Sequence, residues 1–240
     1  MDYPRSKQYD TPAVNARIMG PNPVKLTEEL MRLYGALIPP RSVVMDLGSG
    51  QGVTSVFLAK EYGHTVYAAD LWSDPSDNLA FFTQMGLTNR EIVPVKADAE
   101  ALPFAHGFFD AVVSVDSYNY FGRDPAYLDD KLLPFVKPGG AVLVAIPGMV
   151  KDCHDALPPA LLLSWTPEQM DYMHDASWWA DMVGKARGAE VLSVAPMESN
   201  EEVWHDWLAC ENEYAVGDRR AMEAGAGKYL NFLAIALRRK

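Results

Sequence analysis

The stretch Val43-Val44-Met45-Asp46-Leu47-Gly48-Ser49-Gly50-Gln51-Gly52-Val53 decides the fold of this chain. Its first five residues have the apolar character of a buried strand, and the alternating glycines predict a turn into a helix. Glycines leave the turn without side chains, so backbone N–H groups and the helix start can approach a ligand closely. The dinucleotide fingerprint places its third glycine where this chain has Val53, and Asp46 would repel a pyrophosphate. The stretch therefore predicts a cofactor loop that is poorly suited to NAD.

Two further runs of strand length are each followed by an acidic residue. Residues 65–70 read as a buried strand ending in Asp70, the position that accepts hydrogen bonds from ribose hydroxyls in wound α/β folds. Residues 92–97 read as the next strand and lead to Asp98, which could accept from an exocyclic adenine amine. Leu71 or Trp72 could cover the adenine face. The pattern favours an adenosine ligand that carries positive charge over one that carries phosphates.

Four segments together resemble the class I S-adenosylmethionine-dependent methyltransferases of the domain 11 or 25 type. They are Asp46-Leu47-Gly48-Ser49-Gly50-Gln51-Gly52, Ala69-Asp70, Ala97-Asp98-Ala99-Glu100-Ala101-Leu102-Pro103-Phe104 and Leu133-Pro134-Phe135-Val136-Lys137-Pro138-Gly139-Gly140. They cover roughly residues 40–147, and their joint spacing is far more specific than the glycine loop alone.

The resemblance implies S-adenosylmethionine as the cofactor and S-adenosylhomocysteine as the product. It also implies that Asp46 and Gly48 face the methionine portion. Asp70 would face the ribose, and Asp98 with the backbone of Ala99 would face the adenine edge. The residues expected at the cofactor are Asp46, Gly48, Ser49, Gly50, Gly52, Asp70, Leu71, Trp72, Asp98, Ala99 and Ser114.

Apolar runs alternate with amphipathic segments along most of the chain, which is typical of a parallel sheet with helices on both faces. Strands are predicted at 43–47, 65–70, 92–97, 109–115, 141–146, 190–196 and 229–237. Helices are predicted at 53–61, 75–86, 125–135 and 176–187, and Pro138-Gly139-Gly140 is expected to form the turn into the fifth strand. The predicted fold class is α/β, a Rossmann-like, seven-stranded, mostly parallel sheet with helices on both faces and a small helical cap.

Three segments lie outside this frame and are expected to encode substrate identity. Residues 1–40 form an N-terminal helical arm, in which 27–34 is an amphipathic run that could close over the cofactor. Residues 41–240 form the methyltransferase domain, with cap insertions at about 147–175 and 197–225. The second insertion is expected to contain an acidic, tryptophan-bearing helix.

The loop after the fourth strand is expected to face the transferable methyl group. Methyl transfer from a sulfonium is an in-line displacement, so alignment in a water-poor site can supply most of the catalysis. The candidates to orient the acceptor are Asp116, Tyr118, Asn119 and Tyr120, with Asp116 or a histidine as the base. The alternative is that Tyr120 packs in the core and Asp116 caps a turn. The loop lacks the Asn-Pro-Pro-Tyr motif of enzymes resembling DNA methylases.

Aromatic and histidine side chains cluster in the second half of the chain. His174, Trp178 and Trp179 could form an aromatic wall for a planar or cationic substrate, or Trp178 could dock the cap onto the sheet. His154 lies between acidic neighbours, but adjacent positions point apart, so no metal site is expected. Cys153 and Cys210 have no metal-ligand spacing and are expected to be reduced thiols.

Composition limits the possible partners. The 240-residue chain carries a formal net charge of −11 without clustered lysines and arginines, which argues against a nucleic-acid substrate. No apolar run has the length of a membrane span, and residues 1–7 lack the hydrophobic region of a signal peptide. We therefore expect a cytoplasmic protein without membrane or nucleic-acid partners. Either a monomer or a homodimer is compatible with the sequence.

These observations predict methyl transfer from S-adenosylmethionine to an O, N, S or C atom of a small molecule. One alternative is an NAD(P)-dependent Rossmann oxidoreductase, which Val53 disfavours. Another is a non-catalytic protein that binds S-adenosylmethionine or a partner. The identity of the acceptor is not encoded in any motif.

Overall fold

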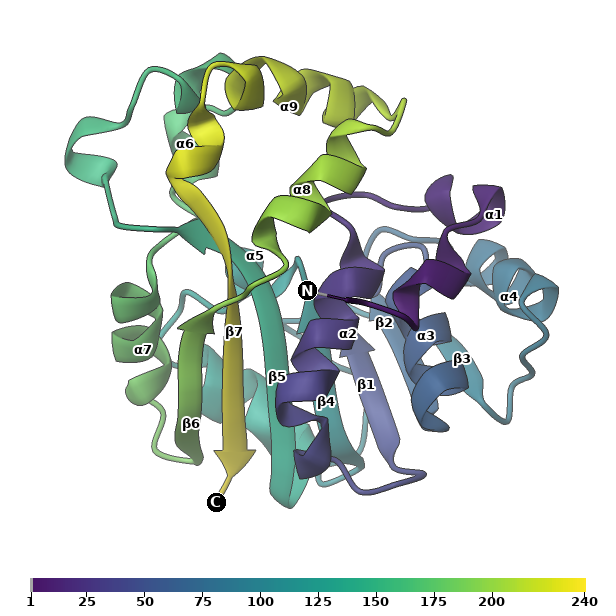
Figure 1. The fold of residues 1–240 in the computed structure, drawn as a ribbon. Helices are drawn as coiled ribbons and strands as arrows, with labels where there is room; N and C mark the ends of the chain where they lie inside the picture. The colour runs from purple at the N-terminus through teal and green to yellow at the C-terminus, as the bar shows by residue number, and fades with distance from the viewer. Residues whose placement is uncertain (1) are drawn as a thin grey trace.

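A seven-stranded sheet in the order β3-β2-β1-β4-β5-β7-β6 forms the centre of the computed structural model, which describes residues 2–240 (Figure 1). The strands are β1 (Val43–Leu47), β2 (Thr65–Asp70), β3 (Ile92–Lys96), β4 (Phe109–Val115), β5 (Val136–Met149), β6 (Ala189–Pro196) and β7 (Leu230–Arg239). The first five pair in parallel, while β7 lies between β5 and β6 and is antiparallel to both. The predicted fold class is confirmed.

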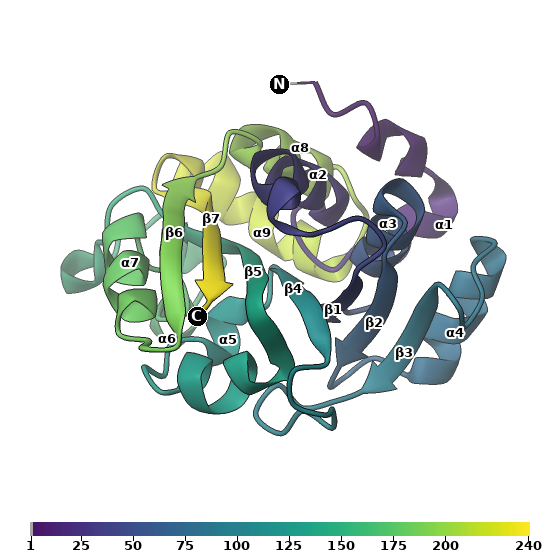
Figure 2. The ribbon, with the colours of Figure 1, turned by 90° about the horizontal axis from the view of Figure 1, so that it is seen from below.

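Helices cover both faces of this sheet (Figure 2). They are α1 (Pro12–Asn15), α2 (Pro23–Tyr34), α3 (Val53–Tyr62), α4 (Pro75–Gln84), α5 (Tyr118–Phe121), α6 (Pro167–Met170), α7 (Ala176–Gly184), α8 (Asn200–Leu208) and α9 (Glu213–Glu223). Short 3-10 turns are η1 (Ser6–Tyr9), η2 (Gly35–Leu37), η4 (Leu133–Phe135), η5 (His154–Ala156), η6 (Leu161–Leu163) and η7 (Ala226–Lys228). Side chains of α2, α3 and α4 share one buried cluster, and those of α5 and α7 share the other. Alternate residues of β5 enter the two clusters, which explains its continuous apolar run.

Local sequence explains where the main helices begin. Pro23 opens α2, and the Asn22 side chain accepts hydrogen bonds from the N–H groups of Val24 and Lys25. Helix α4 follows the same pattern, with Pro75 in its first turn and Asp74 as its cap. Helix α2 therefore begins four residues before the amphipathic run 27–34 that marked it in the sequence.

Two predictions of local structure are corrected. The predicted helix 125–135 is wrong in type, because the chain forms a π-helical turn, η3 (Leu128–Leu132), followed by η4. The Asp129 carboxylate there accepts the N–H groups of Arg187 and Gly188 at 2.9 and 2.8 Å, so tertiary contacts fix the turn. Pro138-Gly139-Gly140 lies within β5, in an irregularity where its register against β4 shifts, rather than in a turn before the strand.

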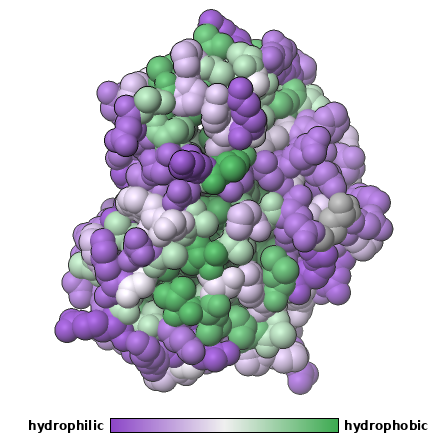
Figure 3. Space-filling view, turned by 60° about the vertical axis from the view of Figure 1, so that its left-hand side comes forward, coloured by the Kyte–Doolittle hydropathy of each residue, from purple (hydrophilic) through white to green (hydrophobic). Residues whose placement is uncertain are grey.

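A cap stands over the carboxyl ends of the parallel strands (Figure 1). It combines η5, η6 and α6 from residues 147–175 with α8, which is the acidic, tryptophan-bearing helix expected in 197–225, and with α9, which follows it. Trp207 is buried in the cap, where its Nε1 donates to Asp218 Oδ2 at 2.9 Å. Figure 3 shows a waist between the cap and the body of the molecule, with apolar side chains gathered over the body on this side. Within residues 2–240, no helix is long and apolar enough to cross a membrane.

The N-terminal arm is attached to the cap by a buried carboxylate. Glu29 of α2 accepts hydrogen bonds from the Tyr3 hydroxyl and from the N–H groups of Glu198 and Ser199, before α8. Each bond to an ionised acceptor contributes about 1.5–3 kcal/mol. Glu29 thus joins the arm, α2 and the entry to α8.

Candidate active site

A cavity of about 350 Å³ opens at the carboxyl ends of β1, β2, β3 and β4. Its walls are the glycine loop after β1, the residues that follow β2 and β3, and the loop after β4. The N-terminal arm closes one side through Arg17, Met19, Gly20 and Pro23. Strand order reverses between β1 and β4, where ligands bind in open α/β sheets.

The three glycines of the loop have left-handed φ angles but different surroundings. A Cβ atom on Gly48 would lie 1.8 Å from the Ser117 hydroxyl, and one on Gly52 would lie 2.4 Å from the Phe82 ring. Gly48 and Gly50 line the cavity together with Ser49, whereas Gly52 does not. The missing side chain of Gly52 therefore serves the packing of α3 against α4, and its contact with the cofactor stays a prediction.

Asp70 lines the cavity and organises the loops around it. Its Oδ2 accepts from the Gly50 N–H at 2.9 Å, and its Oδ1 accepts from the N–H groups of Trp72 and Ser73 at 2.8 Å. A carboxylate has about four acceptor positions, so capacity remains for a ribose hydroxyl. The same side chain therefore positions the glycine loop and presents an acceptor to the cavity.

The predicted adenine side of the cavity is partly apolar and open. Leu71 and Trp72 are 43% and 76% exposed, and both line the cavity with Asp98 and Ala99. Asp98 Oδ1 accepts from the Glu100 N–H at 2.9 Å. The structure therefore brings these four predicted cofactor residues together, and their contacts with the cofactor stay a prediction.

Asp46 and Ser114 are buried and are not among the residues that line the cavity. Asp46 is fully buried, and its Oδ2 accepts hydrogen bonds from the hydroxyls of Thr54 and Ser55 in the first turn of α3. Burial raises its pKa to about 6. Ser114 is also fully buried and donates to Leu47 O at 2.8 Å, tying β4 to β1. Because side chains alternate across a strand, both point away from the cavity lining, and their contact with the cofactor stays a prediction.

The loop after β4 divides the four predicted catalytic residues into two pairs. Asp116 and Tyr120 line the cavity, whereas Tyr118 and Asn119 are 1% exposed and lie outside its lining. Tyr118 packs against aromatic rings of the core, including Trp179. The short helix α5 causes the division, since consecutive helical residues point about 100° apart. The structure does not bring Tyr118 and Asn119 to this cavity, and their catalytic roles stay predictions.

Asp116 has an unusual backbone and an unusual charge environment. Its φ is 55°, a left-handed value that non-glycine residues seldom adopt, and its N–H donates to Ala145 O at 2.7 Å. Burial, with a smaller contribution from Asp218, raises its pKa to about 7. Within residues 2–240 its carboxylate accepts no hydrogen bond, so its oxygens are free to accept a proton from a ligand. Burial also raises the pKa of the neighbouring Tyr120 to about 12.

Several of the residues that line the cavity were not predicted from the sequence. Ser117 lines the cavity and donates to Leu47 O at 3.0 Å, beside Gly48. Its position next to Asp116 was the available signal. Arg17 and Met19 come from the arm, and no motif marks them, because their approach depends on how the arm folds back.

The predicted substrate residues His174, Trp178 and Trp179 do not line this cavity. Trp179 is fully buried in the core between the sheet and α7. The His174 ring stacks on Trp178 at 3.7 Å between centroids. The structure therefore does not bring these three side chains to this cavity, and their contact with a substrate stays a prediction.

Comparisons with known proteins agree with this geometry. Residues 45–144 match the family model described as "Methyltransferase domain". Over 117 residues the chain is 36% identical to 2-methyl-6-phytyl-1,4-hydroquinone methyltransferase of Synechocystis sp., which covers 48% of this chain and 36% of that protein. Over 131 residues it is 27% identical to sarcosine/dimethylglycine N-methyltransferase of Halorhodospira halochloris, which covers 55% and 47%. The chain thus spans less than half the length of these relatives.

Similarity of fold extends further than similarity of sequence. Haemonchus contortus phosphoethanolamine N-methyltransferase 2, solved in complex with S-adenosyl-L-methionine, superposes with a TM-score of 0.69 at 17% identity, covering 98% of this chain and 58% of that one. The family and the fold also remove support from the oxidoreductase alternative. That neighbour was solved with the cofactor that the sequence predicts for this chain. Residues 45–144 therefore form a methyltransferase domain, in a chain that has the fold of the class I S-adenosylmethionine-dependent methyltransferases.

Proposed function

We propose that this chain transfers the methyl group of S-adenosylmethionine to an O, N, S or C atom of a small molecule. The observation that carries the proposal is the pairing, within one cavity, of the Gly50 and Asp70 cofactor wall with the free carboxylate of Asp116. The cofactor would lie along the glycine loop, with Asp70 accepting from ribose and Leu71 or Trp72 over the adenine. Its product would be S-adenosylhomocysteine.

The loop after β4 would hold the acceptor. In-line displacement requires the nucleophilic atom and the methyl carbon to be aligned, which Asp116 and Tyr120 could achieve from one side of the cavity. A pKa near 7 suits a general base that works at neutral pH. This favours an N or O acceptor that arrives with a proton. Asp70, Asp98 and Asp116 outnumber the one cationic lining residue, Arg17, which favours a neutral or cationic molecule.

Calorimetry tests the cofactor half of the proposal. The chain should bind S-adenosylhomocysteine with a dissociation constant on the order of micromolar. Gly50→Val should largely abolish binding, because the new side chain would enter the cavity. Gly107→Val is a matched control, since Gly107 also has a left-handed φ but a Cβ there meets nothing within 4 Å. Equal binding by both variants would contradict the assignment of the loop.

A turnover assay separates the enzyme from a non-catalytic binding protein. Release of S-adenosylhomocysteine is measured over a panel of small amines, alcohols, phenols, thiols and carbon acids. Turnover of at least one compound, lost in Asp116→Asn while binding of S-adenosylhomocysteine persists, supports the proposed reaction. Tight binding without turnover across the panel would favour the binding protein instead.

A further inference from the structure

A histidine and carboxylate cluster lies in the cap, outside the lining of the cavity. It consists of Asp152, His154 and His174, each of which offers one ligand atom within 4.8 Å of the others. His154 Nδ1 lies 2.7 Å from Asp152 Oδ1, and His174 Nδ1 lies 2.9 Å from Asp152 Oδ2. We propose that these three side chains bind a first-row divalent metal ion of the Zn²⁺ type.

The contacts of His154 show that the cluster requires an added positive charge. His154 Nε2 lies 3.0 Å from Met170 O, and a carbonyl can only accept, so this nitrogen carries the ring proton of a neutral imidazole. The lone pair of Nδ1 would then face the Asp152 carboxylate at close range. Either a second proton or a metal ion must lie between them. A ring N–H bonded to a backbone carbonyl is also the usual outer contact of a metal-binding histidine.

The second ring offers a further ligand at the same carboxylate. The ring centroids of His154 and His174 are 4.6 Å apart and His174 Nδ1 faces Asp152 Oδ2, so a metal ion would engage both rings, whereas a proton on His154 engages only one. His174 is held in place by its stack on Trp178, and the Asp152 N–H donates to Asp175 Oδ2 at 3.1 Å. The stack on Trp178 positions His174 and the hydrogen bond to Asp175 positions Asp152. Neither contact uses the ring nitrogens or the Asp152 carboxylate oxygens that would bind the metal.

Ligand type and access also fit. Two imidazoles and one carboxylate, with water in a fourth position, form a common zinc set, whose ligand atoms are about 3.4 Å apart. The separations of 2.7 and 2.9 Å between the histidine nitrogens and the Asp152 oxygens would need to open by about 0.7 and about 0.5 Å. The Asp152, His154 and His174 side chains are 33%, 25% and 10% exposed, so an ion and its water can enter. Sequence spacing alone gave no such signal, because His174 comes from twenty positions further along.

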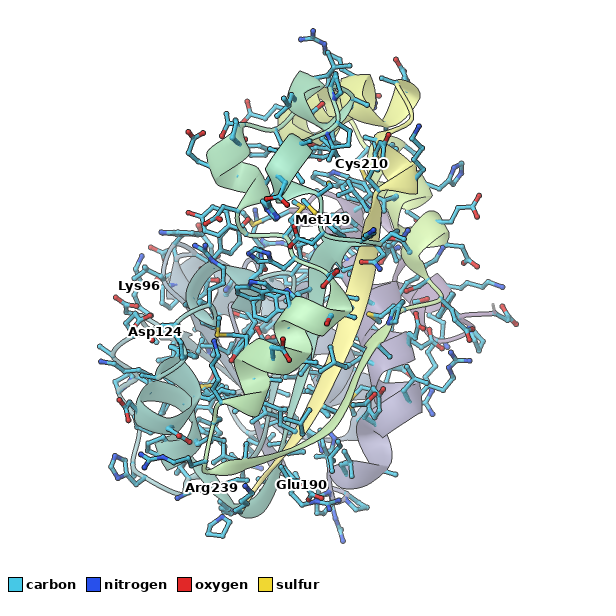
Figure 4. The ribbon with its side chains drawn as sticks, turned by 90° about the vertical axis from the view of Figure 1, so that its left-hand side faces the viewer. Lys96, Asp124, Met149, Glu190, Cys210 and Arg239 are labelled. Carbon is cyan, nitrogen blue, oxygen red and sulfur yellow. The ribbon has the colours of Figure 1, made fainter. Side chains whose placement is uncertain are left out.

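The place of the cluster suggests what the metal would do. Met149, labelled in Figure 4, ends β5 where the chain enters the cap, and its N–H donates to His174 O at 3.1 Å. Asp152 and His154 therefore lie at the start of a cap segment whose end carries His174. Between them, Tyr172 contacts the cavity residue Tyr120 at 5.1 Å between ring centroids. A bound metal would close this segment into a loop and stiffen one side of the cavity mouth.

Metal titration of the full chain tests the proposal. After treatment with a chelator and dialysis, the chain should bind one equivalent of Zn²⁺ by calorimetry and elemental analysis. Its Tm should rise by about 5 °C or more at saturating Zn²⁺. Asp152→Asn and His154→Gln should each weaken Zn²⁺ affinity at least about tenfold. His205→Gln is the matched control, because His205 is exposed on α8 outside the cluster.

Two results would overturn the proposal. Failure of the chain to take up Zn²⁺, Ni²⁺ or Co²⁺ would mean that the cluster holds protons. Uptake unchanged in Asp152→Asn and His154→Gln would place the metal elsewhere. The visible absorption of Co²⁺ offers a second measurement, expected in the chain and in His205→Gln and lost in the cluster variants. If one cluster variant fails to fold, the Co²⁺ absorption of the other variant still tests the site.

Discussion

Replacing Asp116 by asparagine should make the protein more stable and less active. The ordinary pKa of an aspartate is 3.8, and burial raises that of Asp116 to about 7, a difference of about 3 pH units. At about 1.36 kcal/mol per pH unit, keeping this carboxylate ionised in the folded state costs about 4 kcal/mol. Asparagine tolerates the left-handed φ of this position as well as aspartate does, so backbone strain is unchanged.

The sign of the pH dependence follows from proton binding. Between about pH 4 and pH 7 the folded state binds more protons at Asp116 than the unfolded state, so stability falls as the pH rises through this window. The advantage of Asp116→Asn should therefore grow from about 1.5 kcal/mol at pH 5 to about 4 kcal/mol at pH 8. Asp218 is the charged neighbour of this carboxylate and adds to its cost when both are ionised, whereas Tyr120, with a pKa of about 12, stays neutral in this range.

Urea unfolding at pH 5, 6, 7 and 8 measures this difference, with equal m-values as the condition for comparison. Asp110→Asn is a control of opposite sign. Burial alone would raise the pKa of Asp110, but the hydrogen bonds from Lys137 and from the Val43 N–H hold this pKa below its ordinary value. That variant should lose stability at neutral pH, and the loss should shrink in acid. A gain below about 1 kcal/mol at pH 8 for Asp116→Asn, or a gain independent of pH, would refute the reasoning.

Two further substitutions test packing against binding. Gly52→Ala should lower the free energy of unfolding by about 2–3 kcal/mol, because the new Cβ would meet the Phe82 ring. Gly86→Ala is the control, since Gly86 has a similar φ but open space around it, and it should lose only about 1–2 kcal/mol. Urea unfolding measures both values. Trp179→Ala should cost about 3–5 kcal/mol. Trp72→Ala should keep Tm and weaken binding of S-adenosylhomocysteine several-fold, as calorimetry can measure. A Trp179→Ala variant with unchanged Tm but a raised acceptor KM would restore Trp179 as a substrate residue.

The sheet could be predicted from the sequence because its parallel strands are short apolar runs, and the central strands β1 and β4 are buried on both faces. Val43–Leu47 and Thr65–Asp70 are short apolar runs bounded by turn residues, and the structure has them with the same bounds. The helix predicted after Asp124 was wrong because only the local sequence supported it. Asp124-Pro125 reads as a helix start, but contacts of Asp129 with the residues before β6 fix a π-helical turn.

The candidate site divides along similar lines. Gly50, Asp70 and Asp98 could be placed, because the end of a parallel strand fixes its residues at one edge of the sheet. For residues that follow the end of a strand, the sequence does not show which side chains face the cavity. Tyr118 and Tyr120 differ only by their position on α5, which no pattern in the sequence specifies. The metal cluster required the folded cap, since only tertiary structure brings His174 to Asp152.

The position of β7 has a consequence for how the protein matures on the ribosome. Strand β7 follows β6 in the chain but lies between β5 and β6, so β6 has no neighbour in the sheet until residues 230–239 emerge. Strands β1 to β5 can assemble during translation, while β6 must wait with its backbone groups unpaired. Nascent chains stalled before Leu230 should therefore keep this strand accessible to proteases and chaperones, and release of Leu230–Arg239 should remove that access in one step.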